Sequence, residues 1–150
     1  MNLYLLINYK MIEYILITIF VLLTDFIWLI TNTKNYNYLI EKVQKTPFSM
    51  NYIGALLSYI FLLCALFFFS IPLIKMNLQK KNNNLFVLSL FYGGGLGLLL
   101  YGMFNATNYG IFTNYDYKIA ILDTLWGFVI FTISSYLFFS IKHFINIVPK

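Results

Sequence analysis

Two aspartates, Asp25 and Asp123, lie inside apolar stretches that are long enough to cross a membrane. An ionised carboxylate near the bilayer centre costs at least about 2.5 kcal/mol, so such residues mark binding or proton-transfer sites by default. Each aspartate is followed three residues later by a tryptophan, Trp28 or Trp126, which puts both side chains of a pair on one helix face. The chemistry that these residues could perform is proton or cation binding, and polar packing between helices is the alternative.

A stripe of small and polar residues runs along the third apolar stretch. Its members are separated by four, four, four and three residues, which places them on one helix face: Gly93, Gly97, Tyr101, Asn105 and Asn108. The glycines predict the close approach of a neighbouring helix, because small residues have this role in membrane interfaces. The other three residues bring a phenol and two amides toward the membrane side of the aspartates.

The second apolar stretch contributes Tyr59, whose phenol could donate a hydrogen bond to either aspartate. An aromatic membrane anchor is an equally good interpretation of this tyrosine. The predicted polar site consists of Asp25, Trp28, Tyr59, Tyr101, Asn105, Thr107, Asn108, Asp123 and Trp126, with helix packing at Gly93, Gly97 and Gly127.

Four apolar stretches must position these residues, and each has about the 20 residues that a helix needs to cross the hydrocarbon core. They cover residues 11–30, 52–74, 85–104 and 118–141. Backbone groups in lipid must be satisfied within a segment, and the stretches lack the alternation of a β-barrel, so helices are the interpretation left. We therefore predict an all-α fold, an integral membrane four-helix bundle in antiparallel up-down-up-down order, with residues 1–150 as a single domain. Residues 36–43 form either a short interfacial helix or a plain loop.

The antiparallel order predicts which residues meet. Asp25 lies near the end of the first span and Asp123 near the start of the fourth, so both reach the same membrane side, roughly 8 Å from its boundary at 1.5 Å per residue. The lysines on the side of both termini are Lys10, Lys75, Lys80, Lys81, Lys142 and Lys150, and those on the other side are Lys34, Lys42, Lys45 and Lys118. The positive-inside rule then predicts both termini in the cytoplasm.

The composition excludes a soluble protein. Hydrophobic residues make up 61% of the chain and charged residues only 10%, against about 25% charged residues in soluble domains. The net charge of +5 comes from lysines that flank the apolar stretches instead of clustering with aromatics on one face, as a nucleic-acid binder would require. We expect the lipid bilayer as a partner, a homo-oligomer or a membrane protein as further partners, and no nucleic acid.

The sequence offers little material for metal binding or nucleophilic catalysis. His143 is the only histidine and lies near the end of the bundle opposite to the aspartates, and the single cysteine, Cys64, lies in an apolar stretch. The glycine-rich residues 93–97 are inside a span, not between a strand and a helix, which excludes a nucleotide-binding loop. We expect no metal, no cofactor and no catalytic residue, and we favour a non-catalytic protein over an enzyme.

Two motifs carry a resemblance to a known family. The third stretch contains Tyr101-Gly-Met-Phe-Asn105-Ala-Thr107-Asn108, and the fourth contains Asp123-Thr-Leu-Trp126-Gly127. They resemble the domain-of-unknown-function 2177 family (DUF2177) of small predicted membrane proteins, whose pattern runs close to Tyr-x-x-Tyr-Asp-Leu-Thr-Asn and then Asp-x-x-Trp-Gly. The likeness extends over most of the chain through Asp25, Trp28, Tyr59, Pro72, Gly93 and Gly97. It implies the fold and the site, but no activity.

The chain departs from the family pattern at Asn105, where the family has an aspartate. This change removes a carboxylate and weakens the expectation of metal or proton chemistry. Three functions remain open: a non-catalytic membrane protein whose polar cluster serves packing or the recognition of a partner or lipid; a small proton- or cation-coupled transporter that uses Asp25 and Asp123; and a membrane-embedded enzyme acting on lipid, with one of these aspartates as general acid or base.

Overall fold

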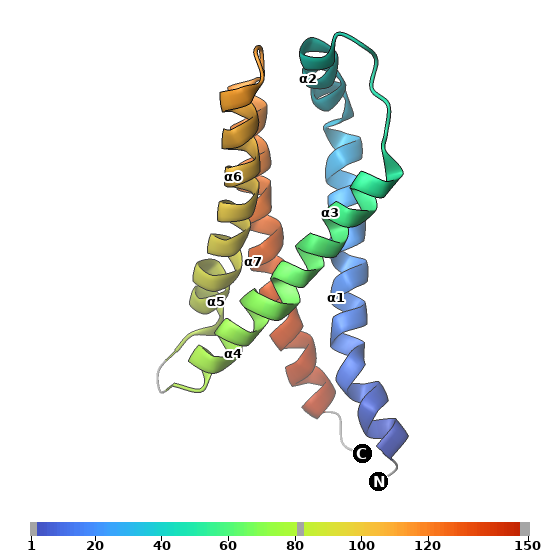
Figure 1. Ribbon diagram of the computed structural model, residues 1–150. Helices are drawn as coiled ribbons and strands as arrows, with labels where there is room; N and C mark the ends of the chain where they lie inside the picture. Colours follow the sequence, from blue (N-terminus) through green and yellow to red (C-terminus); the bar gives the residue numbers. More distant parts are fainter. Residues whose placement is uncertain (1–2, 81–82, 148–150) are drawn as a thin grey trace.

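The computed structural model describes residues 3–80 and 83–147, with side chains described for residues 11–80 and 83–141 (Figure 1). The described residues form helices and contain no strand. In chain order the helical segments are α1 (Leu3–Thr31), α2 (Thr33–Gln44), α3 (Tyr52–Ala65), η1 (Leu66–Ser70), α4 (Ile71–Leu78), α5 (Leu85–Leu88), η2 (Ser89–Gly94), α6 (Gly95–Ile111) and α7 (Tyr117–Ile147). Here η1 and η2 are π-helical segments.

Four helices of the described chain are long and apolar enough to cross a membrane, which confirms the predicted all-α membrane fold. The candidate spans are Met11–Thr31, Tyr52–Leu78, Leu85–Ile111 and Tyr117–Ile141. The third span thus continues beyond residue 104, where the sequence analysis ended it. In Figure 1, α1 begins and α7 ends at the same end of the molecule, whereas α2 and the α6–α7 connection lie at the other. The side of the membrane that each end faces stays a prediction.

The connections end and restart the helices through local hydrogen bonds. The Asn51 side chain accepts hydrogen bonds from the backbone N–H groups of Ile53 and Gly54, and Asn84 caps α5 in the same way. The first connection contains the helix α2, so the helical alternative for residues 36–43 is the correct one. Lys45 ends this helix in a left-handed conformation, with φ 63°.

The last helix, α7, lies at the centre of the packing. It contacts α1 on one side and η2 with α6 on the other. On α1, buried residues recur every four positions at Glu13, Ile17, Val21 and Asp25, which gives this helix one buried face. Because Asp25 lies on this face, the four-residue spacing that buries Ile17 and Val21 also brings Asp25 to α7.

Glycines allow the third span to approach α7 closely. A Cβ atom at Gly97 would lie 2.8 Å from the carbonyl carbon of Gly127, and one at Gly93 would lie 2.9 Å from the backbone oxygen of Phe131. Gly94, which the sequence analysis did not single out, is equally confined, at 2.6 Å from the ring of Phe128. Close backbone approach of this kind is the established role of small residues between membrane helices.

The first π-helical segment, η1, has a local cause in the sequence. Pro72 lies two residues after the end of η1, and a proline inside a helix lacks an N–H group and clashes with the carbonyl group four residues earlier. A wider π turn before the proline accommodates this defect. The segment ends at Ser70, whose buried hydroxyl lies 2.8 Å from that of Ser135 on α7, so the wider turn also brings a polar contact into the bundle.

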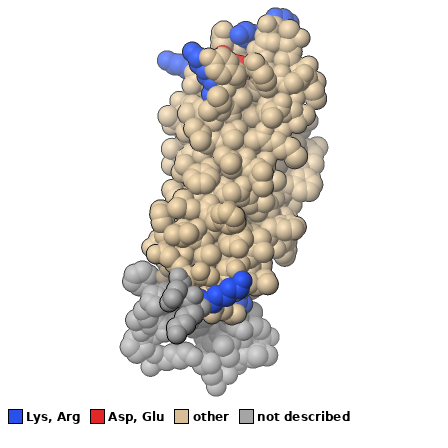
Figure 2. Space-filling model, turned by 90° about the vertical axis from the view of Figure 1, so that its left-hand side faces the viewer, with Lys and Arg blue, Asp and Glu red and all other residues tan. Residues whose placement is uncertain are grey.

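The surface agrees with a membrane environment. In Figure 2, lysines lie at the two ends of the face that is drawn, and the wide belt between them shows no charged side chain among the described residues. Many large apolar side chains on the spans are exposed, among them Phe26, Ile27, Phe61 and Phe91. Exposed apolar side chains at this density are compatible with lipid as the surrounding solvent, and the protein is a multi-pass membrane protein.

Candidate functional site

The first aspartate of the site, Asp25 on α1, receives hydrogen bonds from two other helices. The Tyr59 hydroxyl on α3 donates to its Oδ2 at 2.9 Å, and the indole Nε1 of Trp126 on α7 donates to its Oδ1 at 2.9 Å. Asp25 is only 8% exposed. A single carboxylate therefore joins three helices, and it does so with one donor on each oxygen.

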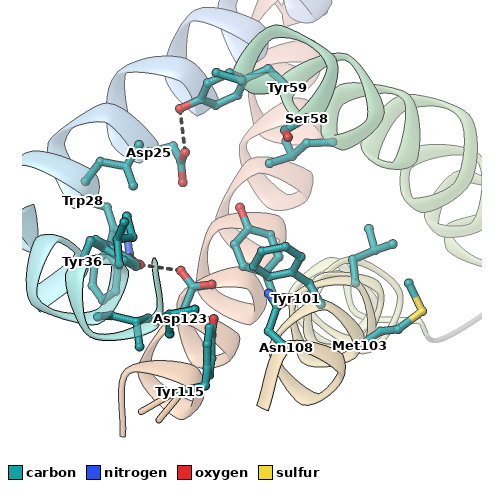
Figure 3. A pocket seen from close by; sticks show the side chains of 18 of the residues that line it. Asp25, Trp28, Tyr36, Ser58, Tyr59, Tyr101, Met103, Asn108, Tyr115 and Asp123 are labelled. Atoms are coloured by element: carbon teal, nitrogen blue, oxygen red, sulfur yellow. Dashed lines mark hydrogen bonds between the residues drawn. The ribbon is translucent and has the colours of Figure 1, made fainter. Parts of the chain in front are cut away.

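The second aspartate, Asp123 on α7, also has one side-chain donor on each oxygen. The Tyr36 hydroxyl on α2 donates to its Oδ1 at 2.6 Å (Figure 3). The Asn105 Nδ2 on α6 donates to its Oδ2 at 2.8 Å. The short distance to Tyr36 is typical of a hydroxyl that donates to a charged oxygen. The two carboxylates are thus held by different sets of donors.

The two Asp-x-x-Trp pairs are interlocked across α1 and α7. Trp28 and Trp126 stack in parallel, with ring centroids 4.5 Å apart and an interplanar angle of 1°. Trp126 donates to the aspartate of the other helix, Asp25. Trp28 donates at 3.0 Å to the Tyr36 hydroxyl, which in turn donates to Asp123. Each tryptophan therefore supports the aspartate that lies on the opposite helix, one directly and one through a tyrosine.

Asn105 has a role that an aspartate could not fill when ionised. Its Nδ2 donates both to Asp123 and, at 3.0 Å, to the backbone oxygen of Tyr101, while its Oδ1 accepts from the Tyr115 hydroxyl at 2.9 Å. A carboxylate has no N–H group and would face Asp123 with a second negative charge. The amide at position 105 thus supplies a donor that Asp123 uses.

Two members of the network, Tyr36 and Tyr115, were not recognised in the sequence. Both lie in connections outside the spans, where tyrosines are common as interfacial residues. Burial and the neighbouring Asp123 carboxylate raise the pKa of the Tyr36 phenol far above its usual value. Burial is also the main cause of the raised pKa of Tyr115. Both phenols therefore keep their protons and act as donors. Each lies eight residues from a predicted site residue, Trp28 or Asp123, but a helix boundary falls within each interval, so this spacing gave no periodic signal.

A cavity of about 920 Å³ lies beside the aspartates, lined by residues of α1, α2, α3, α6 and α7 and of the connection between α6 and α7 (Figure 3). Its polar end consists of Asp25, Asp123, Tyr36, Tyr59, Tyr101 and Tyr115. The other walls are mainly apolar, with Leu29, Leu39, Ile40, Leu62, Leu100 and Phe104 among them. The cavity thus combines a cluster of hydroxyl and carboxyl groups with a larger apolar volume.

The structure brings the predicted site residues together, with one exception. Thr107 is exposed, its side chain makes no hydrogen bond with the described residues, and it does not line the cavity. It follows the buried Asn105 by two positions, which turns a helical residue by about 200° to the opposite face. Asn108, three positions on, returns to the inner face and lines the cavity. Thr107 is therefore removed from the candidate site.

The described residues contain no group of three His, Cys, Asp or Glu side chains that could hold a metal ion. The two aspartates have no third acidic or imidazole ligand beside them, and their oxygens already accept hydrogen bonds from neutral donors. His143 lies among the residues whose side chains are not described.

With this geometry established, a comparison with family models identifies the chain. The model described as "Predicted membrane protein (DUF2177)" matches residues 10–140, which include both aspartates and nearly all of the four candidate spans. The chain belongs to this family. Comparison of this DUF2177 protein with curated proteins and with solved structures gave no match. The family description names a membrane location and no activity, so the function must be argued from the site itself.

Proposed function

We propose that this DUF2177 protein is a non-catalytic membrane protein whose cavity recognises an amphiphile taken from the bilayer. The observation that carries the proposal is the cavity of about 920 Å³, which has carboxylates and phenols at one end and apolar walls elsewhere. Pockets for small ligands commonly occupy about 300–1,000 Å³ and combine apolar walls with a few placed polar groups. A molecule with a polar head and an apolar chain matches both parts.

The position of the cavity supports entry from the lipid. Three of its lining residues, Phe61, Met103 and Phe104, are 71%, 67% and 59% exposed and belong to the apolar surface of α3 and α6. An acyl chain in the bilayer would therefore meet the same side chains that line the cavity. If the ligand enters between α3 and α6, its acyl chain does not have to pass through water.

The hydrogen bonds at the polar end support recognition more than proton transfer. All four carboxylate oxygens accept from neutral donors, and these donors hold Asp25 and Asp123 in fixed orientations. Fixed polar groups supported by neighbouring hydrogen bonds are what a specific binding site needs. The same bonds contribute to packing at about 0.6 kcal/mol each, so packing and recognition are compatible roles of one cluster.

Tryptophan fluorescence provides a direct test, since the protein has only two tryptophans and both lie in the site. A lipid with a brominated acyl chain quenches an indole that it contacts. We expect quenching that saturates at a small fraction of brominated lipid in nanodiscs. Ala55→Phe, which fills the cavity, should weaken it, whereas Ala106→Phe, on an exposed position outside the lining, should not. Quenching that grows without saturation and is equal in all three proteins would reject the proposal.

Proton- or cation-coupled transport is the second candidate, because two carboxylates within the membrane line one cavity. Four helices enclose little space, so a pore would need a homo-oligomer. We would measure proton and cation flux in vesicles for the parent protein, for Asp25→Asn and Asp123→Asn, and for the double variant. Flux that is absent, or unchanged in the double variant, excludes this function. A lipid-modifying enzyme would instead change the lipid composition of the host, and the double variant would abolish the change.

The orientation belongs to the same proposal. We place both ends of the chain in the cytoplasm because more lysines flank the spans on that side. The amphiphile would then bind in the outer half of the bilayer. The test is a reporter enzyme that is active only outside the cytoplasm, fused after Lys150. Activity of this reporter would reverse the assignment, although the cavity and its polar end would be unaffected.

A further inference from the structure

The charges around the cavity are unbalanced. Among the described residues, its lining contains two carboxylates, Asp25 and Asp123, and no lysine or histidine. Arginine does not occur in the sequence. The lysine of α2 that approaches an aromatic ring, Lys42, lies 5.4 Å from the ring centre of Tyr38, and neither residue lines the cavity. The hydrogen bonds to the carboxylates come from neutral groups, so they orient the charges without compensating them.

Aromatic rings surround the same end of the cavity. Trp28, Tyr36, Tyr59, Tyr101 and Tyr115 come from five different parts of the chain and all contribute to its lining (Figure 3). The faces of such rings attract cations, and rings arranged around a pocket are the usual receptors for ammonium groups. Carboxylates together with several aromatic rings therefore define an environment for a positive charge that has an organic, weakly hydrated surface.

Other head groups fit this end less well. A phosphate or carboxylate would approach two negative charges without a nearby lysine to offset the repulsion. An inorganic cation would find two acidic ligands instead of the larger oxygen set that Mg²⁺ or Ca²⁺ requires, in a cavity far larger than an ion. The apolar walls also have no role in binding a bare ion.

We propose that the amphiphile bound by this cavity has a cationic amine head group, a primary or a quaternary ammonium, which lies between Asp25 and Asp123 and against the surrounding aromatic rings. This inference rests on the proposed function, since it names the head group of the same ligand. The single positive charge offsets one of the two negative charges and interacts with both carboxylates, and the acyl or alkyl chain occupies the apolar part between α3 and α6.

The test compares ligands that share one dodecyl chain and differ only in the head group. Dodecyltrimethylammonium, dodecylamine, dodecanol and dodecyl sulfate are titrated into the protein in nanodiscs of uncharged surface, and binding is followed by fluorescence of Trp28 and Trp126. Tetramethylammonium supplies the head group without a chain. We expect the two ammonium ligands to bind at least about tenfold more tightly than dodecanol, dodecyl sulfate to bind most weakly, and tetramethylammonium to bind weakly as well.

Variants of the carboxylates give a second measurement. Asp25→Asn and Asp123→Asn should each reduce the preference for ammonium over dodecanol while dodecanol binding persists. Asp116→Asn is the matched control, because Asp116 lies outside the cavity and caps α7 through an oxygen that an asparagine retains. The ligand series on the unchanged protein does not depend on whether these variants fold.

The outcomes separate the two proposals. Equal binding of dodecylamine and dodecanol would overturn the cationic head group and leave the amphiphile site intact. Binding of tetramethylammonium as tight as that of its dodecyl derivative would show a site for a water-soluble cation and overturn the amphiphile. No saturable binding of any dodecyl ligand would overturn both.

Discussion

Where η1 and η2 meet α7, the polar contact is made by short hydroxyls, whereas at the opposite end of the bundle the contacts are made by carboxylates, phenols and indoles. The Ser70 and Ser135 hydroxyls lie 2.8 Å apart, and a Cβ atom at Gly93 would lie 2.6 Å from the Ser135 hydroxyl, so the helices are as close as their backbones allow. At the other end, side chains as long as Tyr59 and Tyr36 reach across to aspartates, and a cavity remains between the helices.

This difference shows that polarity has two structural consequences in one membrane bundle. Small polar residues let helices pack against each other, so their hydrogen bonds cost little space. Long polar residues hold helices at a distance set by the side chains, and the distance leaves room for a ligand. The contact of Gly93 and Gly97 with α7 is the close contact of the bundle, and the end that contains Asp25, Asp123 and the cavity is its open end.

The largest effect is expected where the helices are closest. In Gly97→Ala, the new methyl group would lie against the Gly127 carbonyl group and the Phe131 Cβ atom, neither of which can move without shifting α7. We expect a loss of about 1–3 kcal/mol, measured as a lower midpoint of thermal unfolding in detergent. Gly95→Ala, on the same helix with no atom within 4 Å, should be neutral or more stable by about 0.5–1 kcal/mol. Equal effects of both variants would contradict the close approach.

A smaller effect is expected from placing an aspartate at position 105, at the open end. Asn105→Asp removes the donor to Asp123 and adds a second carboxyl group beside it. We expect a loss of about 1–2 kcal/mol at neutral pH that diminishes in acid, because a protonated carboxyl group can donate as the amide does. Thermal unfolding between pH 5 and 8 measures this dependence. Asn35→Asp, on an exposed position of α2, should show neither the loss nor its change with pH.

The sequence predicted the close contact more completely than the open end. The glycine spacing and the apolar stretches gave the four spans and the helix face that meets α7, because these are periodic features of single helices. The antiparallel order then led to the proximity of Asp25 and Asp123. Tyr36 and Tyr115 could not be predicted, since their positions depend on how two connections fold back over the ends of the spans, which no periodicity records.

The same limit explains the one predicted residue that lies away from the cavity and the hydrogen-bonded cluster. Thr107 belongs to a motif that is contiguous in sequence, and a motif does not say which of its members face inward. The cavity itself was also beyond prediction. It depends on the distance between α3 and α6, and the sequence of α3 does not indicate that distance. The two unpredicted tyrosines therefore provide the most specific tests of the open end.

The first of these tests concerns α2. Tyr36→Phe removes the hydrogen bond to Asp123 and the acceptor of Trp28, and should cost about 0.5–1.5 kcal/mol. Hydrogen exchange in α2 should become faster, since Tyr36 ties this helix to α7. Tyr38→Phe, on an exposed position of the same helix, is the control. Unchanged exchange in Tyr36→Phe would show that other contacts hold α2 in place.

Alkali provides an independent measurement on the same phenol. The pKa of Tyr36 is raised in the folded protein above its usual value of about 10, so its contribution to stability is present below that pH and is lost as the pH rises further. We therefore expect the parent protein to lose more stability than Tyr36→Phe between about pH 10 and 12. Parallel losses in both proteins would mean that Tyr36 ionises as easily when folded as when unfolded.

The smallest effect is expected for Tyr115→Phe, because this change removes one hydrogen bond and leaves both carboxylates with their donors. The Asn105 Oδ1 atom loses its partner, while its Nδ2 still donates to Asp123. A loss of about 0.6 kcal/mol is expected, or about 1–2 °C in the unfolding midpoint, with Tyr117→Phe at an exposed position as the control. If Tyr115→Phe lowered the unfolding midpoint as much as Asn105→Asp, Tyr115 would have to hold the Asn105 side chain in the orientation in which it donates to Asp123. The hydrogen bonds of the open end would then depend on one another.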